Sequence, residues 1–203
     1  TTVSSGTRKF SGIHFGFNFA TEIWATRNIW AGLEFGRSWG SWKKREGNSS
    51  FLTNGVAIGR YKLVAGYKFL PMGFFYGPQV DAYGGFRRYS FNYDAKKSEK
   101  IGETSIKGIL LGARGSMPVM KTVRAFLTLE AMPIAGYGED TDLFNEDDSS
   151  HTYMIQIGGL YEYTYNFQIR SALEFIAAKS KFKGEQSISH KNINLLLGIS
   201  YNF

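Results

Sequence analysis

The chain has 203 residues, of which 43% are hydrophobic and 16% aromatic, with a formal net charge of +7 and no cysteine. The lack of cysteine excludes disulfides, thiolate chemistry and cysteine-based zinc sites, and no apolar run is long enough for a transmembrane helix. Because no linker or compositional break is visible, we expect a single domain over residues 1–203. The first six residues are polar and show no signal peptide, so we expect a mature or trimmed form.

Segments in which apolar and polar residues alternate recur along the whole chain. Alternation with a period of two is typical of a strand with one apolar and one polar face. The pattern predicts nine strands, at about residues 8–20, 28–42, 53–69, 74–93, 104–117, 123–138, 152–163, 167–182 and 191–203. Most of these segments are longer than the roughly nine to eleven residues that a tilted strand needs to cross the hydrocarbon of a bilayer.

The connections between these segments alternate in length. Short ones are expected at residues 70–73, 118–122 and 164–166, and long polar ones at residues 43–50, 94–103, 139–150 and 183–190. Bacterial outer-membrane barrels have short periplasmic turns and longer outer loops. The alternation therefore predicts that the C-terminus lies in the periplasm.

The last eleven residues show the pattern most clearly, because every odd position from Ile193 to Phe203 is apolar. Tyr201 and the terminal Phe203 look like the C-terminal signal by which outer-membrane barrels are recognised for insertion. With this strand and the alternating connections, nearly the whole chain resembles the small bacterial outer-membrane barrels of the OmpA/OmpX/OmpW-like superfamily. The resemblance implies an all-β fold, an antiparallel transmembrane β-barrel of eight to ten strands in an up-and-down meander, located in the bacterial outer membrane.

The number of strands stays open at this stage. Bacterial single-chain barrels have even strand counts, whereas nine segments are visible. Four long loops and a periplasmic C-terminus account for eight strands from about Asn28 onward, so the segment at residues 8–20 is a surplus. Either a preceding strand is missing and the barrel has ten strands, or one element is split or miscounted and it has eight.

The phase of the alternation predicts an apolar outer face and a polar inner face. Aromatic residues gather near the strand ends, as a periplasmic girdle requires: Tyr67, Phe69, Phe74, Tyr76, Tyr161, Tyr163, Phe167, Tyr201 and Phe203. The inner face is predicted to hold a lumen charge network formed by His14, Glu34, Arg60, Lys62, Asp81, Arg114, Arg124, Glu130, Glu162, Arg170 and Glu174. With His14 neutral, five bases face five acids, and a balanced set in a narrow barrel can pair and close the lumen.

The predicted long loops carry the remaining charge. The basic residues expected to face lipopolysaccharide, where they would lower the energy of anionic headgroups, are Lys43, Lys44, Arg45, Lys96, Lys97, Lys100, Lys181 and Lys183. The third loop is acidic, with Glu139, Asp140, Asp142, Glu146, Asp147 and Asp148. It lacks the glycine and the spacing of an EF-hand loop. We therefore expect a solvated loop, no metal and no cofactor.

We do not expect an enzyme. The chain has three histidines, and His151 follows Asp147, Asp148, Ser149 and Ser150, so a Ser-His-Asp set at the outer rim is chemically conceivable. Loop residues this close in sequence are usually only solvated, and a histidine on the inner face, such as His14, is more often structural than a base. No Gly-x-Ser-x-Gly or His-Glu-x-x-His motif is present. Nucleic acid is not an expected partner either, because the basic residues do not form a single face.

These patterns predict an integral outer-membrane barrel with a structural, anchoring or interaction role. Its expected contacts are outer-membrane lipid and lipopolysaccharide, with a protein partner or a larger envelope complex as further candidates. The alternatives are a narrow pore or transporter for small solutes and, third, an outer-membrane lipid-modifying enzyme.

Overall fold

The structure is a computed structural model that describes residues 2–3, 8–46, 49–93, 104–139, 147–164, 167–183 and 187–201. These residues form ten strands: β1 (Thr2–Val3), β2 (Arg8–Trp24), β3 (Ile29–Glu46), β4 (Ser49–Phe69), β5 (Gln79–Tyr93), β6 (Thr104–Met120), β7 (Val123–Glu139), β8 (Asp147–Glu162), β9 (Phe167–Phe182) and β10 (Ser187–Tyr201). Within the described ranges, no helix is long and apolar enough to cross a membrane.

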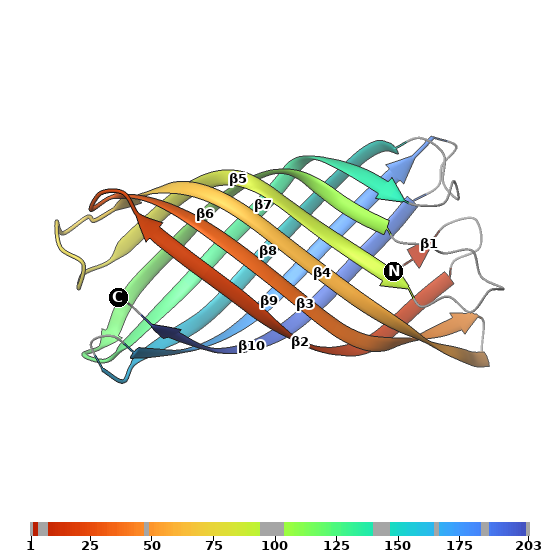
Figure 1. Ribbon diagram of the computed structural model, residues 1–203, viewed down its shortest axis with the longest axis horizontal. Helices are drawn as coiled ribbons and strands as arrows, with labels where there is room; N and C mark the ends of the chain where they lie inside the picture. The colour runs from red at the N-terminus through yellow and green to blue at the C-terminus, as the bar shows by residue number, and fades with distance from the viewer. Residues whose placement is uncertain are drawn as a thin grey trace.

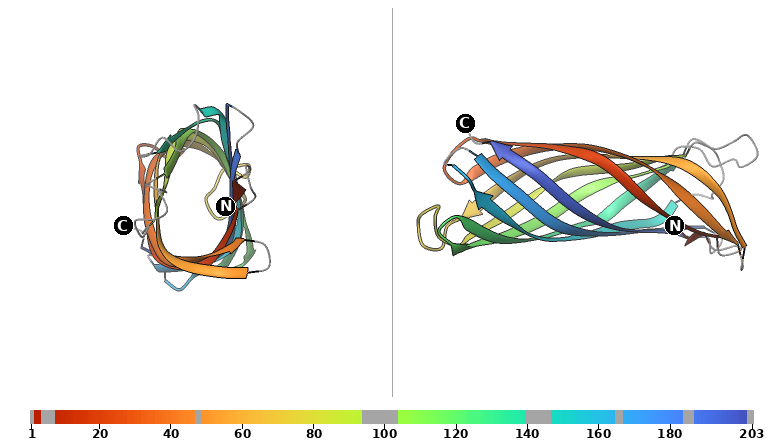
Figure 2. Two further views of the ribbon diagram at one scale, coloured as in Figure 1. Left: turned by 90° about the vertical axis from the view of Figure 1, so that its right-hand side faces the viewer. Right: turned by 90° about the horizontal axis from the view of Figure 1, so that it is seen from below.

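The nine long strands, β2 to β10, form an up-and-down meander in which each strand pairs antiparallel with the next. The sheet curls round on itself (Figure 1), and the view along the barrel shows a ring (Figure 2). The short strand β1 pairs with both β10 and β2 and completes the ring at one end. The predicted all-β antiparallel meander is confirmed, and its nine long strands and one short strand lie within the eight to ten strands expected.

The two ends of the barrel differ in their connections. We call the end that carries residues 70–78 and the last residues of β10 the turn end, and the opposite end, where β1 lies, the loop end; they are at the left and the right of Figure 1. The aromatic residues predicted for one girdle lie together at the turn end, from Tyr67 and Phe69 on β4 to Tyr201 on β10. Phe203 lies outside the described residues.

Several predicted loops are shorter than expected. β3 continues to Glu46 and β4 begins at Ser49, so residues 43–50 are mostly strand. The loops expected at residues 139–150 and 183–190 shrink because β8 begins at Asp147 and β10 at Ser187. At the turn end, residues 74–78 belong to the connection, which is longer than the predicted turn at residues 70–73. At the loop end the alternation fails as a guide because polar residues follow one another along the sequence, as Lys43, Lys44 and Arg45 do. The loop expected at residues 94–103 lies outside the described residues.

Side chains alternate between an exposed outer face and a buried interior, as the phasing predicts. On β9, Leu173 and Phe175 point outward and are exposed, whereas Glu174 and Ile176 point inward and are buried. The outer wall is apolar over most of its area, with exposed residues that include Leu63, Phe86, Ile109, Leu111, Leu127, Leu129, Ile155, Ile157, Leu195 and Leu197.

The interior is not polar throughout, which corrects the predicted polar inner face. An apolar layer fills it toward the loop end and consists of Val56, Ile58, Tyr89, Phe91, Ile106, Leu110, Met132, Met154, Ile176 and Ala178. Ile106 and Leu110 are among the most completely buried side chains of the described chain. The charged side chains lie between this apolar layer and the turn end. The apolar layer and the charged zone thus follow one another along the interior.

Candidate functional site

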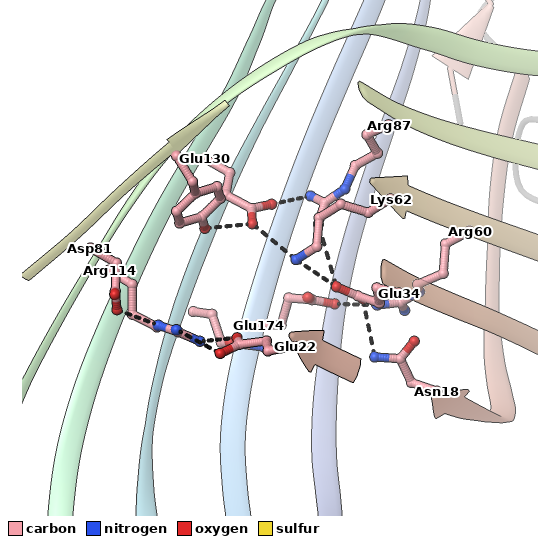
Figure 3. Close-up of polar contacts among 12 residues, drawn as sticks. Asn18, Glu22, Glu34, Arg60, Lys62, Asp81, Arg87, Arg114, Glu130 and Glu174 are labelled. Atoms are coloured by element: carbon pink, nitrogen blue, oxygen red, sulfur yellow. Dashed lines mark hydrogen bonds and ion pairs between the residues drawn. The ribbon is translucent and has the colours of Figure 1, made fainter. Parts of the chain in front are cut away.

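The middle of the barrel holds a set of paired charges that we call the central network, shown in Figure 3. It consists of Glu34 on β3, Arg60 and Lys62 on β4, Arg87 on β5, Glu130 on β7 and Glu174 on β9. Side chains of a strand point alternately to its two faces, and each of these residues occupies a position that faces the interior. Five strands therefore contribute to one polar cluster.

Glu130 is the most enclosed carboxylate of the central network, with a side chain only 1% exposed. Lys62 Nζ lies 3.2 Å from its Oε1 atom, and the hydroxyl group of Tyr83 donates a hydrogen bond of 2.7 Å to the same oxygen. Arg87 forms an ion pair with the other carboxylate oxygen. A buried carboxylate is tolerated when cations and hydrogen-bond donors surround it, and Glu130 has both.

Glu34 receives a similar set of partners. Lys62 Nζ lies 2.6 Å from Glu34 Oε2, so one ammonium group bridges Glu34 and Glu130. Asn18 on β2 donates a hydrogen bond of 3.1 Å to Glu34 Oε1, and Arg87 approaches Glu34 Oε2 to 3.9 Å. Together these contacts connect side chains of five strands, β2, β3, β4, β5 and β7.

The third acid of the central network, Glu174, reaches across the interior. Arg60 Nη1 donates to Glu174 Oε1 at 3.0 Å, and Asn194 on β10 donates to the same oxygen at 2.8 Å. β4 and β9 lie on different parts of the barrel wall and share no ladder. The ion pair therefore joins two walls that the backbone does not pair.

A second group, the turn-end cluster, consists of Glu22, Lys68, Asp81 and Arg114. Arg114 donates to Asp81 Oδ2 at 2.9 Å and to Glu22 Oε1 at 2.8 Å. Lys68 Nζ lies 3.6 Å from Asp81 Oδ1 and donates to Gln79 Oε1 at 2.8 Å. Arg114 on β6 thus crosses the interior to reach Glu22 on β2, which Figure 3 shows.

Not every residue predicted for the lumen network joins these two groups. Arg124 donates to the carbonyl oxygen of Gly77, at 2.8 Å, and so holds the connection between β4 and β5. Arg170 donates to Gln156 Oε1 at 2.6 Å and lies over the ring of Phe126. His14 on β2 and Glu162 at the end of β8 are not members of either group as defined.

Several participants were absent from the predicted set, among them Glu22, Lys68, Tyr83 and Arg87. Lys68 and Arg87 have the same phase as the predicted Lys62 and Asp81 on their strands, so the alternation already carried the signal for both. Tyr83 also has the inward phase of its strand, but a tyrosine alone does not indicate a buried carboxylate. Glu22 lies beyond the predicted end of the first strand at residue 20, and the longer β2 explains the omission.

Four of the five basic residues predicted for outer loops that the structure describes are strand residues. Lys43, Lys44 and Arg45 belong to β3, and Lys181 to β9, which corrects their assignment to loops. Lys183 lies in the turn after β9, and both Lys181 and Lys183 are exposed. The other three, Lys96, Lys97 and Lys100, lie outside the described residues, as does Phe203 of the predicted insertion signal. Tyr201 ends β10 with an exposed side chain.

The conceivable Ser-His-Asp set does not assemble around Ser150. Ser150 points into the barrel and donates to the hydroxyl group of Ser180 at 2.7 Å, whereas His151, the next residue of β8, takes the opposite face beside Tyr153. His190 is buried in β10, where its ring stacks on Phe91 at 4.2 Å. Among the described residues, no group of histidine and acidic side chains could hold a metal ion.

Comparisons with protein-family models, curated proteins and solved structures find no match to this chain. The functional reading therefore depends on the geometry alone. Within the central network and within the turn-end cluster, acidic and basic side chains pair with one another across strands. This arrangement is suited to holding the barrel wall together.

Proposed function

We propose that the protein is an integral β-barrel of a bacterial outer membrane, with a structural, anchoring or interaction role and a closed lumen. The observation that carries the proposal is the contrast between its two faces. Large apolar side chains cover the outer wall, while ion pairs such as Lys62 with Glu130 lie inside. A barrel that is dissolved in water needs polar side chains on its outer face, because a large exposed apolar area favours association with lipid or protein.

The length of the apolar wall supports a lipid environment. On β9, the outward positions between Phe167 and Lys179 carry no charge, and the same is true of β10 between Lys191 and Tyr201. These stretches are about as long as the nine to eleven residues with which a tilted strand crosses the hydrocarbon. All backbone groups in a membrane need partners, and a barrel supplies them between its strands.

The residues at the two borders of this band also support the proposal. Toward the turn end, the band finishes in aromatic rings, among them Tyr161, Tyr163 and Tyr201, which prefer the interface between lipid and water. Toward the loop end it finishes in exposed Lys179 and Lys191. Ammonium groups at this level would contact the phosphates of lipopolysaccharide. The proposed orientation has the turn end in the periplasm.

A filled interior favours the structural role over a pore. The apolar layer crosses the interior toward the loop end, and the paired charges occupy the interior below it. Hydrated ions need a continuous wet path, and two successive filled zones oppose one. The proposed role is therefore to anchor the loops and the outer wall for contacts with lipid or with partner proteins.

Fractionation tests the proposal. Expressed with a secretion signal in a Gram-negative host, the protein should stay in the outer-membrane pellet after washes with salt and alkaline carbonate and be released by detergent. An unheated sample should migrate differently from a boiled one on a denaturing gel, since closed barrels resist detergent unfolding. Recovery in the soluble periplasmic fraction would refute membrane insertion.

A further inference from the structure

The first and last long strands flank a seam in the barrel wall. β1 lies between them at the loop end, where Thr2 pairs with Lys9 of β2 on one side and with Ser189 of β10 on the other. Beyond Lys9 and Ser189, the described ladders of β2 run to β3 alone and those of β10 run to β9 alone. The right-hand view of Figure 2 shows β2 and β10 side by side. From β1 to the turn end, no described ladder therefore joins β2 to β10.

The side chains along the seam are more exposed than those of the continuous wall. Phe15 on β2 and Leu197 on β10 point outward and are 79% and 76% exposed, compared with 53% for Leu173 on β9. The inward residues Asn18 and Ala20 of β2 are also exposed, although inward positions of the strands away from the seam are mostly buried. The outward side chains of both strands and these two inward side chains of β2 are therefore more exposed than their counterparts in the continuous wall.

The direction of the two strands prevents a simple closure. β2 and β10 both run from the loop end to the turn end, because an odd number of meander strands leaves the first and the last parallel. Pairing β2 directly with β10 would therefore insert one parallel ladder into an otherwise antiparallel barrel. Bacterial single-chain barrels avoid such a ladder because they have even strand counts. One strand between them restores antiparallel pairing on both sides. β1 already pairs in this way over two residues.

We propose that the seam is a strand-binding groove, and that its occupant is the segment of chain directly preceding Thr1, which continues β1 toward the turn end. The register of β1 sets the length of this segment. Each residue further back along this segment pairs with the next residue along β2 and the next residue along β10. Tyr201 lies twelve positions beyond Ser189, and Trp24 lies fifteen positions beyond Lys9. A strand extending twelve to fifteen residues back from Thr2 therefore covers both edges.

The seam also specifies the chemistry of its occupant. In this register Phe15 lies level with Leu195, and Phe17 with Leu197, all on the outer face. The occupant needs apolar side chains at alternate positions on this side. On the inner side it passes Asn18 and Gly198, where a β-carbon at the glycine would meet open space. Small or polar side chains fit there. This inference depends on strand direction and register, and it stands apart from the location proposed above.

The lack of cysteine allows a direct test by disulfide formation. The probe is the chain extended before Thr1 by twelve alternating leucine and threonine residues, with a cysteine at the seventh position before Thr1, and refolded into lipid vesicles. Phe17 and Leu197 each lie eight positions beyond the partners of Thr2. The added cysteine should therefore form a disulfide with Phe17→Cys and, in a separate variant, with Leu197→Cys. One matched control moves the added cysteine to the sixth position before Thr1, which faces inward. A second control places two prolines in the added strand. Both variants should lose most of the disulfide.

Three results would overturn the proposal. The first is a probe that forms a disulfide with only one edge or with neither, although a Leu173→Cys/Leu195→Cys pair on adjoining strands does so and reports a folded wall. The second is a rapid disulfide within the unextended Phe17→Cys/Leu197→Cys chain, which would mean that β2 pairs with β10. The third is a disulfide between chains that carry Phe17→Cys and Leu197→Cys separately, which would assign the seam to a second copy.

Discussion

Arg60 on β4 and Glu174 on β9 meet inside the barrel, with 3.0 Å between Nη1 and Oε1, although 114 residues separate them in the sequence. Both side chains are largely shielded from solvent. β4 and β9 share no ladder, so this ion pair couples parts of the wall that backbone hydrogen bonds leave independent. The paired interior therefore contributes to the tertiary stability of the barrel as well as to its filling.

Glu130→Ala should destabilise the barrel more than other single changes in the network. The substitution leaves Lys62 and Arg87 without their shared buried carboxylate and Tyr83 without its acceptor. Removing one partner of a buried ion pair costs about 3–5 kcal/mol. We expect a loss of this size in the free energy of unfolding, measured by urea titration of barrels refolded in lipid vesicles.

A double-mutant cycle serves as its control. Glu130→Gln and Arg87→Met should each destabilise the barrel, and the double variant should lose less than the sum of the two single losses, because the second change removes a charge that the first has already left unpaired. Additive losses within about 0.5 kcal/mol would show that the two residues act independently and would contradict the assigned pairing.

The alternation in the sequence was sufficient to predict the nine long strands and the side chains that point outward from them. The nine predicted segments correspond to β2 through β10, because an apolar outer wall imposes a strict period of two where charges are excluded. Beyond the apolar outer wall, the sequence no longer has to alternate with a period of two. Lys43, Lys44 and Arg45 follow one another in β3, with no apolar residue among them, and this run was predicted to be a loop.

The partners inside the barrel could not be predicted in the same way. Alternation indicates that Arg60 and Glu174 point inward, but which inward residues meet depends on strand tilt and on the stagger between strands, and neither is encoded in a local pattern. The apolar layer was missed for a related reason. Ile106, Leu110 and Met154 lie on the inner face near charged neighbours, and the outward residues of the same strands are also apolar, so the contrast between the faces is weak there.

A charged side chain introduced on the outer wall should lower the free energy of unfolding more, the deeper it lies in the bilayer. Leu173 lies near the middle of the uncharged stretch of β9, and Ala177 lies two residues from Lys179 at its border. In a membrane, Leu173→Arg should cost about 2–4 kcal/mol and Ala177→Arg about 0–1 kcal/mol. Urea titration in lipid vesicles measures both losses. Equal losses for the two variants would contradict the proposed position of the bilayer.

The lumen should be closed to ions. We expect no steady, porin-like conductance from the purified protein in planar bilayers, because the apolar layer and the central network fill successive zones of the interior. Glu130→Ala should remain non-conducting, since Ile106 and Leu110 still fill the apolar layer. Voltage-stable channels in the unmodified protein would favour the narrow-pore alternative. A current that first appears in Glu130→Ala would show that the charges alone are the barrier.

Two glycines offer a final matched comparison. At Gly85 on β5, a β-carbon would collide with the carbonyl oxygen of Leu63 and come within 2.7 Å of the Cα atom of Val64, both in the backbone of β4. At Gly115 on β6, a β-carbon would meet nothing within 4 Å. Because paired strands cannot separate locally without losing hydrogen bonds, we expect Gly85→Ala to cost about 1–3 kcal/mol.

Gly115→Ala should leave the barrel as stable as before or stabilise it by up to about 1 kcal/mol, since alanine restricts the unfolded chain. Both variants add one methyl group to a paired strand, so the difference between their urea midpoints isolates the close approach of β4 and β5. If Gly85→Ala folds with an unchanged midpoint, the backbones of these two strands are further apart at Gly85 than the structure places them.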